Sequence, residues 1–353
     1  MEPVKQVAFQ TNFDKSYNCF DIATDLLTQI FHRHHQLMFL NSWGFSFCDL
    51  ANQSLAKGLD PMFGDNLLPL EYYHGIKLTL HQFKSVELAW EYLIHEITTK
   101  QYAIISTDTY WCPWNPRYQK INRPHYVLVV GLKKSEKKLL CLDKEAFITK
   151  QTPAELPFDD LIKSFDGFFS YDLLPENDTY TVCEVINNVI KRYITQEDST
   201  LPLSKQYLDK KYTADYSTQA EVKISSRNSV KMYFLQIVQF AKALDGRNLN
   251  EEWSGYENVN DAPFFRKLSD IYQGRRKFAI FLDFLADQFN SIKVKQLAYE
   301  MNLISKNWQN IRFLFLQYSQ DLLTNPLSIV IDKIQEMSER EERFVWSLFS
   351  LIS

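Results

Sequence analysis

Hydrophobic and polar positions give the two halves of the chain different periodicities. In the first half, short runs of β-branched and aromatic residues are bounded by turn residues or charges, a pattern typical of strands. The predicted strands are residues 102–110, 126–132 and 138–143, and the sequence KKSEKK between the last two predicts the turn of an antiparallel hairpin. Helical spacing predicts helices at residues 19–31 and 86–99. It also predicts a short helix at residues 157–165, which begins with a proline.

From a polar stretch at residues 173–180 onward, helical spacing dominates. The expected helices are residues 182–194, 230–244, 264–289, 291–319 and 327–352, with a polar excursion at 194–219. A length of 353 residues suggests two domains. We therefore predict an α+β fold, in which a domain with an antiparallel sheet at residues 1–175 precedes a mainly helical domain at residues 176–353.

Composition disfavours several classes of partner. The chain has 9 glycines and neither a G-x-G-x-x-G nor a G-x-x-x-x-G-K-[ST] motif, so nucleotide binding has no support. A net charge of −4 without a basic block disfavours nucleic acid. The sequence shows neither a signal-peptide layout nor a run of about 18 uncharged apolar residues. We therefore expect a soluble, cytoplasmic protein without a membrane segment.

Cysteine and histidine spacing gives no support for a metal centre. The five cysteines are odd in number and lack C-x-x-C spacing, so neither a disulfide framework nor a zinc site is expected. His32 and His35 stand three residues apart near a predicted helix end, where they suggest metal ligands. No third ligand lies at a defined offset from them, so no bound metal is expected.

Cys19 stands at the predicted start of the first long helix. The positive end of the helix dipole and the free backbone N–H groups at such a position favour a thiolate, and the same N–H groups stabilise an oxyanion. The alternative is a small buried residue, which is common for an isolated cysteine. Cys112 is a weaker candidate thiol because no helix begins there.

His125 opens a predicted strand directly after a proline, which holds its backbone extended. We expect its ring at the rim of the sheet, where a base can reach a neighbouring element. The alternative is a core or surface histidine whose hydrogen bonds are satisfied structurally. Asp143 closes the next predicted strand and is either the carboxylate that orients the imidazole or a plain strand-terminating aspartate.

The register of the hairpin decides whether these two residues meet. An odd-length loop places Asp143 directly opposite His125, and Gly131 is suited to a bulge that sets this register. A symmetric even turn centred on Ser135–Glu136 places residue 146 opposite His125 instead. The sequence leaves both registers open.

Cysteine at the head of a helix, histidine opening a later strand and aspartate closing the next is the chain order of papain-like cysteine enzymes. The chain more closely resembles the butirosin biosynthesis protein H-like family, which is related to the cysteine peptidase domains that process double-glycine leader peptides. The resemblance covers about residues 12–165 and implies a papain-like domain with a nucleophile helix. The segments that carry it are NCFDIATDLL (18–27), LMFLNSWGFSF (37–47), YAIISTDTYWCPW (102–114), PHYVLVVGL (124–132) and LLCLDKEAF (139–147).

This resemblance implies an acyltransferase of antibiotic-type, secondary-metabolite biosynthesis. Its acyl donor is a carrier-protein phosphopantetheine thioester, its acceptor is a small-molecule amine, and it has no bound cofactor. In this chain the resemblance implies Cys19 as nucleophile, His125 as base and Asp143 as the group that holds the ring. The alternatives are a thioesterase, amidase or peptidase with the same triad, and a catalytically inactive binding module.

The oxyanion donor departs from the papain-like pattern, which often places a glutamine six residues before the cysteine. Here that residue is Phe13, and the nearby amides of Asn18 and Asn12 are the candidates, with Gln10 also close in sequence. The aromatic segment 109–118 is expected to form either the wall of a substrate pocket or a hydrophobic loop packed on the core. Its candidate substrate-binding residues are Asp108, Tyr110, Trp111, Trp114 and Arg117.

The helical half carries no catalytic signature. Arg275, Arg276 and Lys277 form a basic cluster that is interpreted either as a docking patch for an acidic carrier protein or as a solvated helix end. The apolar stripes of the last helices are expected to pack in the core or against a second copy of the chain in a homodimer.

Overall fold

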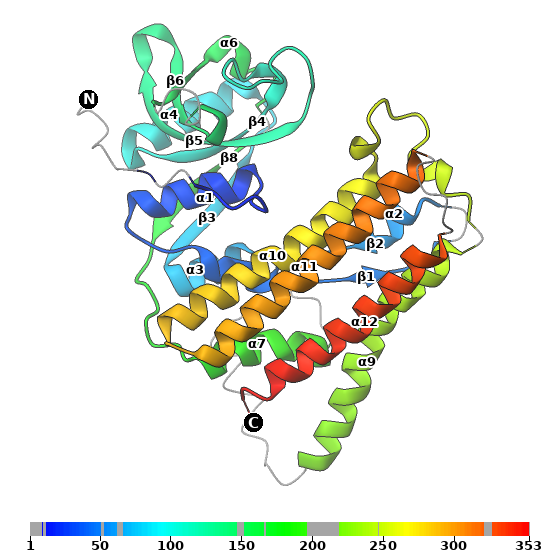
Figure 1. The fold of residues 1–353 in the computed structure, drawn as a ribbon. Helices are drawn as coiled ribbons and strands as arrows, with labels where there is room; N and C mark the ends of the chain where they lie inside the picture. Colours follow the sequence, from blue (N-terminus) through cyan, green and yellow to red (C-terminus); the bar gives the residue numbers. More distant parts are fainter. Residues whose placement is uncertain are drawn as a thin grey trace. The chain divides into compact units, whose positions relative to one another are not determined.

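The computed structural model describes residues 9, 12–50, 53–61, 66–146, 152–165, 167–195, 219–245, 247–320 and 327–352 (Figure 1). The chain forms two compact units, the first from residues 1–35 and 70–177 and the second from 36–69 and 178–353. This division differs from a single boundary at residue 175, because residues 36–69 pack within the helical unit. Of these residues, the side chains of Phe39, Trp43 and Phe45 are almost completely buried.

The first unit is built on a six-stranded antiparallel sheet, which together with the helical second unit confirms the predicted α+β class. Its helices are α1 (Cys19–Ile30), the part of α3 (Leu67–His74) from residue 70, α4 (Val86–Lys100) and the short α6 (Phe158–Leu161), with a 3-10 turn η2 (Thr109–Trp111). In spatial order the strands are β3 (Ile76–Gln82), β8 (Gly167–Leu173), β4 (Ala103–Asp108), β5 (Pro124–Lys133), β6 (Lys138–Leu142) and β7 (Ala154–Pro157).

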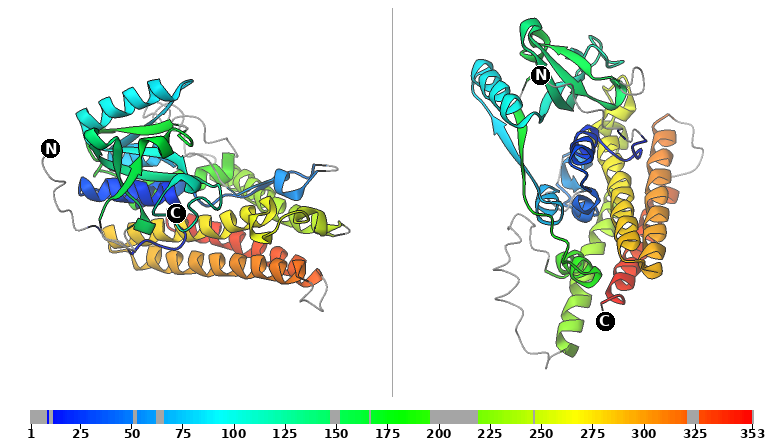
Figure 2. Two further views of the ribbon diagram at one scale, coloured as in Figure 1. Left: turned by 90° about the horizontal axis from the view of Figure 1, so that it is seen from above. Right: turned by 90° about the vertical axis from the view of Figure 1, so that its left-hand side faces the viewer.

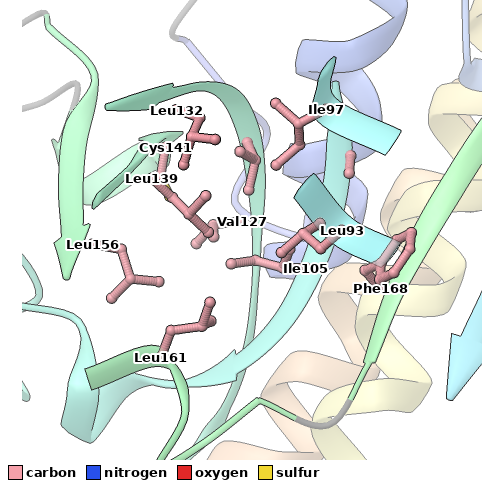
Figure 3. Close-up of a cluster of buried hydrophobic side chains, with 12 residues drawn as sticks. Leu93, Ile97, Ile105, Val127, Leu132, Leu139, Cys141, Leu156, Leu161 and Phe168 are labelled. Carbon is pink, nitrogen blue, oxygen red and sulfur yellow. The ribbon is translucent and has the colours of Figure 1, made fainter. Parts of the chain in front are cut away.

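Strand β5 is covered on both faces, which explains its nearly uninterrupted apolar sequence. Val127 and Val129 belong to a core cluster shared with β4, β6, β7, β8, α4 and α6, and Figure 3 shows Val127 among the side chains of this cluster. On the opposite face Phe20 of α1 packs edge-on against Tyr126, with ring centroids 5.3 Å apart. The strand is therefore a rigid support for the histidine near its start.

The β5–β6 hairpin is confirmed, but the register that places Asp143 directly opposite His125 is wrong. The turn η3 (Lys134–Glu136) continues into Lys137, whose φ of 50° closes an even loop between Lys133 and Lys138. The predicted bulge at Gly131 is present and shifts the register by one residue between Val129 and Gly131. Beyond the last pair, Leu128 with Leu142, Asp143 lies level with Val127 and therefore diagonal to His125.

The second unit is mainly helical, as predicted. It contains η1 (Gln36–Asn41), β1 (Ser46–Phe47), α2 (Leu55–Gly58), β2 (Leu59–Asp60), α7 (Val182–Thr195), α9 (Gln219–Leu244), η5 (Leu249–Glu252), η6 (Val259–Asp261), α10 (Pro263–Gln288), α11 (Ile292–Ser319) and α12 (Ser328–Phe349). Helices α10 and α11 lie side by side as an antiparallel hairpin (Figures 1 and 2). None of the described helices combines the length and the apolar character that a membrane crossing requires.

Both interpretations of the basic cluster are wrong, because these residues lie inside α10 instead of at a solvated helix end. Arg275 is 0% exposed and forms two hydrogen bonds to Glu341, from Nε at 3.0 Å and from Nη2 at 2.9 Å. Arg276 donates to Asn302, and Lys277 lies over the ring of Phe39. The guanidinium is therefore part of the core and not a surface for a carrier protein.

Candidate active site

The capping residues of α1 place Cys19 at the first position of the helix. Asn18 is the N-cap, and its Oδ1 accepts the backbone N–H of Asp21 at 2.9 Å. In return Asp21 Oδ2 accepts the backbone N–H of Asn18 at 2.8 Å, which completes a capping box. Cys19 is partly exposed at this helix start, so the residue is accessible to solvent.

The helix start is also a source of oxyanion donors. The backbone N–H groups of the first helical residues, Cys19 and Phe20, have no acceptor within the helix. The Oδ1 atom of Asn18 is engaged in the cap, while Asn12 is exposed and Phe13 is buried. Gln10 lies outside the described residues. The N-terminal amides of α1 are therefore the donors best placed beside the sulfur.

His125 and Asp143 form a buried pair beside the thiol. Nε2 of His125 lies 2.9 Å from Oδ2 of Asp143, and the two residues are 8% and 4% exposed. Because Nε2 faces the carboxylate, Nδ1 is the ring nitrogen left to face the Cys19 thiol, with which the ring also hydrogen-bonds. The structure thus brings the three predicted catalytic residues together.

The electrostatics of this pair favour a charged imidazole and an ionised carboxylate. Burial lowers the pKa of His125, but the hydrogen bonds to Asp143 and Cys19 outweigh burial and raise this pKa to about 10. Burial raises the pKa of Asp143, but its contacts with the His125 ring, with Trp114 and with the backbone N–H of Glu145 lower it overall. The ring therefore keeps its proton through neutral pH.

Trp114 contacts Asp143 and does not line the cleft between β4 and β5. Its indole Nε1 donates to Oδ2 of Asp143 at 2.6 Å, so this oxygen serves both the indole and the imidazole. The sequence identified Trp114 as an aromatic wall residue, because nothing in its spacing reveals a partner 29 positions later.

The remaining cysteines are poor competitors of Cys19. Cys112 is completely buried, its Sγ donates to the backbone carbonyl of Asp108 at 3.4 Å, and burial raises the pKa of its thiol. Burial likewise raises the pKa of Cys141. Cys48 and Cys183 are exposed but belong to the second unit. Cys19 is therefore the accessible thiol of the first unit.

A cleft of about 250 Å³ opens where β4 ends and β5 begins. Thr107, one of its lining residues, pairs with His125 across these strands, and Pro124 directly precedes the histidine. Most of its lining residues are polar, and the full set is Ser106, Thr107, Asp108, Trp111, Asn122, Pro124, Lys163 and Ser164. Sequence reasoning missed Lys163 and Ser164, since they follow α6 and reach the cleft only through the fold.

Two of the five predicted substrate-binding residues, Asp108 and Trp111, line this cleft, whereas Tyr110, Trp114 and Arg117 are not among its lining residues. Oδ1 of Asp108 accepts the backbone N–H groups of Tyr110 at 2.7 Å and of Arg123 at 3.1 Å. The Tyr110 ring packs edge-on against Trp111. The backbone N–H of Arg117 donates to Asn115 Oδ1 within the loop.

The histidine cluster after α1 is structural in the described part of the chain. His35 is buried, its Nε2 lies 3.0 Å from the Tyr17 hydroxyl, and its Nδ1 lies 3.4 Å from Asp25 Oδ1. His32 adopts a left-handed conformation with a φ of 54° at the helix end. Among the described residues, no three histidine, cysteine, aspartate or glutamate side chains are grouped to hold a metal ion.

Comparison with known families identifies part of the chain. Residues 30–144 match the family model described as butirosin biosynthesis protein H, N-terminal. The matched segment includes His125 and Asp143 and begins after Cys19. A search of curated proteins found no match. The predicted resemblance is confirmed by the family match.

Proposed function

Since residues 30–144 match the model of the butirosin biosynthesis protein H N-terminal family, we propose that the chain is a cysteine-dependent acyltransferase of natural-product biosynthesis. Its donor is an acyl group on the phosphopantetheine thioester of an acyl or peptidyl carrier protein, and its acceptor is a small-molecule amine. The observation that supports this proposal most strongly is the buried His125–Asp143 pair beside a cysteine at a helix start.

In the proposed first step, Cys19 forms an acyl-enzyme. The Cys19 thiolate attacks the thioester carbonyl while the His125 imidazolium stands beside it. The backbone N–H groups at the start of α1 stabilise the oxyanion that develops. The bond between the acyl carbon and the pantetheine sulfur breaks, and His125 gives its proton to the departing thiolate. The carrier protein leaves with a free thiol.

In the second step, the amine takes the place of the carrier protein. It attacks the acyl-enzyme carbonyl, and the neutral His125 accepts the proton that the amine loses. The bond between the acyl carbon and the Cys19 sulfur then breaks, which restores the thiolate–imidazolium pair. Transfer requires that the amine, and not water, occupies the position of attack.

We assign the amine acceptor to the cleft beside His125. The hydroxyls of Ser106, Thr107 and Ser164 and the carboxylate of Asp108 offer hydrogen-bond acceptors, which suit an ammonium or hydroxyl group better than an aliphatic acyl chain. At about 250 Å³ the cleft holds a small molecule or part of one. A carrier protein would dock outside it and deliver only its pantetheine arm.

The test is to incubate the protein with a panel of acyl-loaded carrier proteins and to follow its intact mass. We expect an acyl adduct that peptide mapping places on Cys19, that disappears in Cys19→Ala, and that an amine discharges to an amide. Cys183→Ser, which removes an exposed thiol of the second unit, is the matched control and keeps the adduct. Release of free acid without any amine would indicate a hydrolase, and a protein that accepts no thioester contradicts the proposal.

A further inference from the structure

We propose that Trp114 is a positioning residue of the active site, which holds the Asp143 carboxylate in the orientation that binds the His125 ring. This inference rests on the proposed triad, but it concerns a residue that the triad does not include. It assigns to the aromatic loop a role in setting the charge state of the site instead of in contacting substrate.

The first observation is the shared oxygen. Oδ2 of Asp143 lies 2.6 Å from the indole Nε1 of Trp114 and 2.9 Å from Nε2 of His125. An indole N–H can only donate a hydrogen bond, so Trp114 needs an acceptor. Asp143 Oδ2 is that acceptor. The carboxylate is also held by the backbone N–H of Glu145. These donors fix the rotation of the Asp143 carboxylate about its Cβ–Cγ bond. The carboxylate in turn fixes the plane of the His125 ring.

The second observation is that the loop holds the indole in place before any substrate arrives. Asn115 N–H donates to the Cys112 carbonyl at 2.9 Å, and Gln119 N–H donates to the Tyr110 carbonyl at 2.9 Å. Backbone hydrogen bonds therefore lie on both sides of Trp114. Its ring packs against the core cluster between the sheet and α4. Such support from packing and from further hydrogen bonds is what keeps a catalytic group in productive geometry.

The third observation is electrostatic. Asp143 is buried, and burial alone raises the pKa of a carboxyl group. The pKa of Asp143 nevertheless stays below its ordinary value, and the Trp114 hydrogen bond is one of the contacts that lower it. Without the Trp114 donor, the ionised form of Asp143 is less stable, so it stabilises the His125 cation less. The protonated form of His125 then persists over a narrower pH range.

The experiment is the pH profile of Cys19 alkylation by iodoacetamide in the full chain, with Trp114→Phe, which removes the N–H but keeps an aromatic ring. We expect the rate at neutral pH to fall about tenfold, as the loss of a hydrogen bond to a charged group implies. We also expect the upper inflection of the profile, where His125 loses its proton, to move to lower pH. Trp90→Phe in α4 is the control, because Trp90 packs on the same core cluster as Trp114 but its ring lies against Phe158.

A double-mutant cycle separates this role from a general loss of structure. If Trp114 acts through Asp143, Trp114→Phe has little further effect in the Asp143→Asn background. A full additive loss in that background overturns the inference, and so does an unchanged profile in Trp114→Phe. An alkylation rate of Cys19 that is the same with and without His125 contradicts the proposed triad instead. The two failures are therefore distinguishable.

A spectroscopic measurement keeps the inference testable if Trp114→Phe does not fold. In protein labelled with ¹⁵N-tryptophan, the Trp114 indole N–H resonance should move in Asp143→Asn and follow the ionisation of the pair with pH. The other tryptophans, including Trp90, serve as internal references. A Trp114 resonance that stays unchanged in Asp143→Asn overturns the inference.

Discussion

His125 and Asp143 are diagonal neighbours across the β5–β6 hairpin, and their side chains meet at an Nε2–Oδ2 distance of 2.9 Å. The bulge between Val129 and Gly131 is what brings Asp143 to this position, one residue past the end of β6. In a diagonal contact the two side chains must lean toward each other along the strands, so the contact fixes the directions of the His125 and Asp143 side chains. The ring also hydrogen-bonds with Cys19 at the start of α1.

Replacing His125 should strongly lower the rate at which Cys19 is alkylated. In His125→Ala we expect the rate of alkylation of Cys19 at pH 7 to fall at least about 10²-fold, because the thiol loses the base and cation beside it. Iodoacetamide labelling followed by peptide mapping measures this rate for each cysteine. His81→Gln is the control, since His81 pairs with Ser170 in the same sheet. Equal labelling of His125→Ala and the unmodified protein would contradict the assignment.

The contribution of the ion pair to stability should depend on pH in a defined direction. The pKa of His125 is raised from 6.5 to about 10, so its contribution is complete below about pH 6.5 and is lost as the pH rises toward 10. The pKa of Asp143 is lowered from 3.8, so its contribution is present above about pH 4 and is lost in acid. The loss of stability in Asp143→Asn should therefore be greatest between about pH 4 and 6.5.

Urea unfolding of the two proteins at several pH values measures this difference. The gap between their free energies of unfolding should shrink steadily between pH 7 and pH 10. A gap that widens over this range would mean that His125 is neutral in the folded protein. Asp172→Asn, at an exposed ion pair with Lys100, is the control that should show a small and nearly constant effect.

Local features of the sequence were enough to predict the secondary structure in which the candidate catalytic residues stand. The helical spacing after Cys19 predicts a helix that starts there, and the structure adds Asn18 as the N-cap of that helix. The apolar run after His125 and the charged turn likewise predict the hairpin. The register could not be predicted, since it depends on Lys137 adopting a positive φ that its side chain does not favour.

Contacts between distant residues account for what the sequence did not reveal. Arg275 looked like part of a surface cluster, because Glu341 stands 66 positions away and Trp43 comes from the first quarter of the chain. The hydrogen bond from Trp114 to Asp143 is similarly non-local. Periodicity reports burial of apolar faces, but it carries no information on which buried polar groups satisfy one another.

Removing the charge of Asp108 should affect the acceptor and not the donor. In Asp108→Asn the Oδ1 atom remains as acceptor for the N–H groups of Tyr110 and Arg123, so the loop is kept. If the cleft binds the amine, its KM should rise about tenfold while the rate of acylation of Cys19 stays unchanged. Steady-state transfer at varied amine concentration, together with single-turnover acylation, separates the two. A change in acylation alone would assign the cleft to the donor.

The Arg275–Glu341 pair should be essential to the helical unit. Both residues are 0% exposed, and the indole N–H groups of Trp43 and Trp308 also donate to the Glu341 carboxylate, each at 2.6 Å. Glu341→Gln leaves a buried guanidinium without its counter-charge, which should lower the free energy of unfolding by about 3–5 kcal/mol. Chemical denaturation followed by tryptophan fluorescence measures the loss, since two of the partners are tryptophans.

An ion pair on the same helix provides the comparison that isolates burial as the cause. Arg343 and Glu339 also lie on α12, with Nη1 3.7 Å from Oε2, but both side chains are mostly exposed. Glu339→Gln should therefore change the free energy of unfolding by less than about 1 kcal/mol. Combining Glu341→Gln with Arg275→Met removes the unpaired charge, so the double variant should be less destabilised than the sum of the two single variants. Strict additivity would mean that the two groups do not interact in the folded protein.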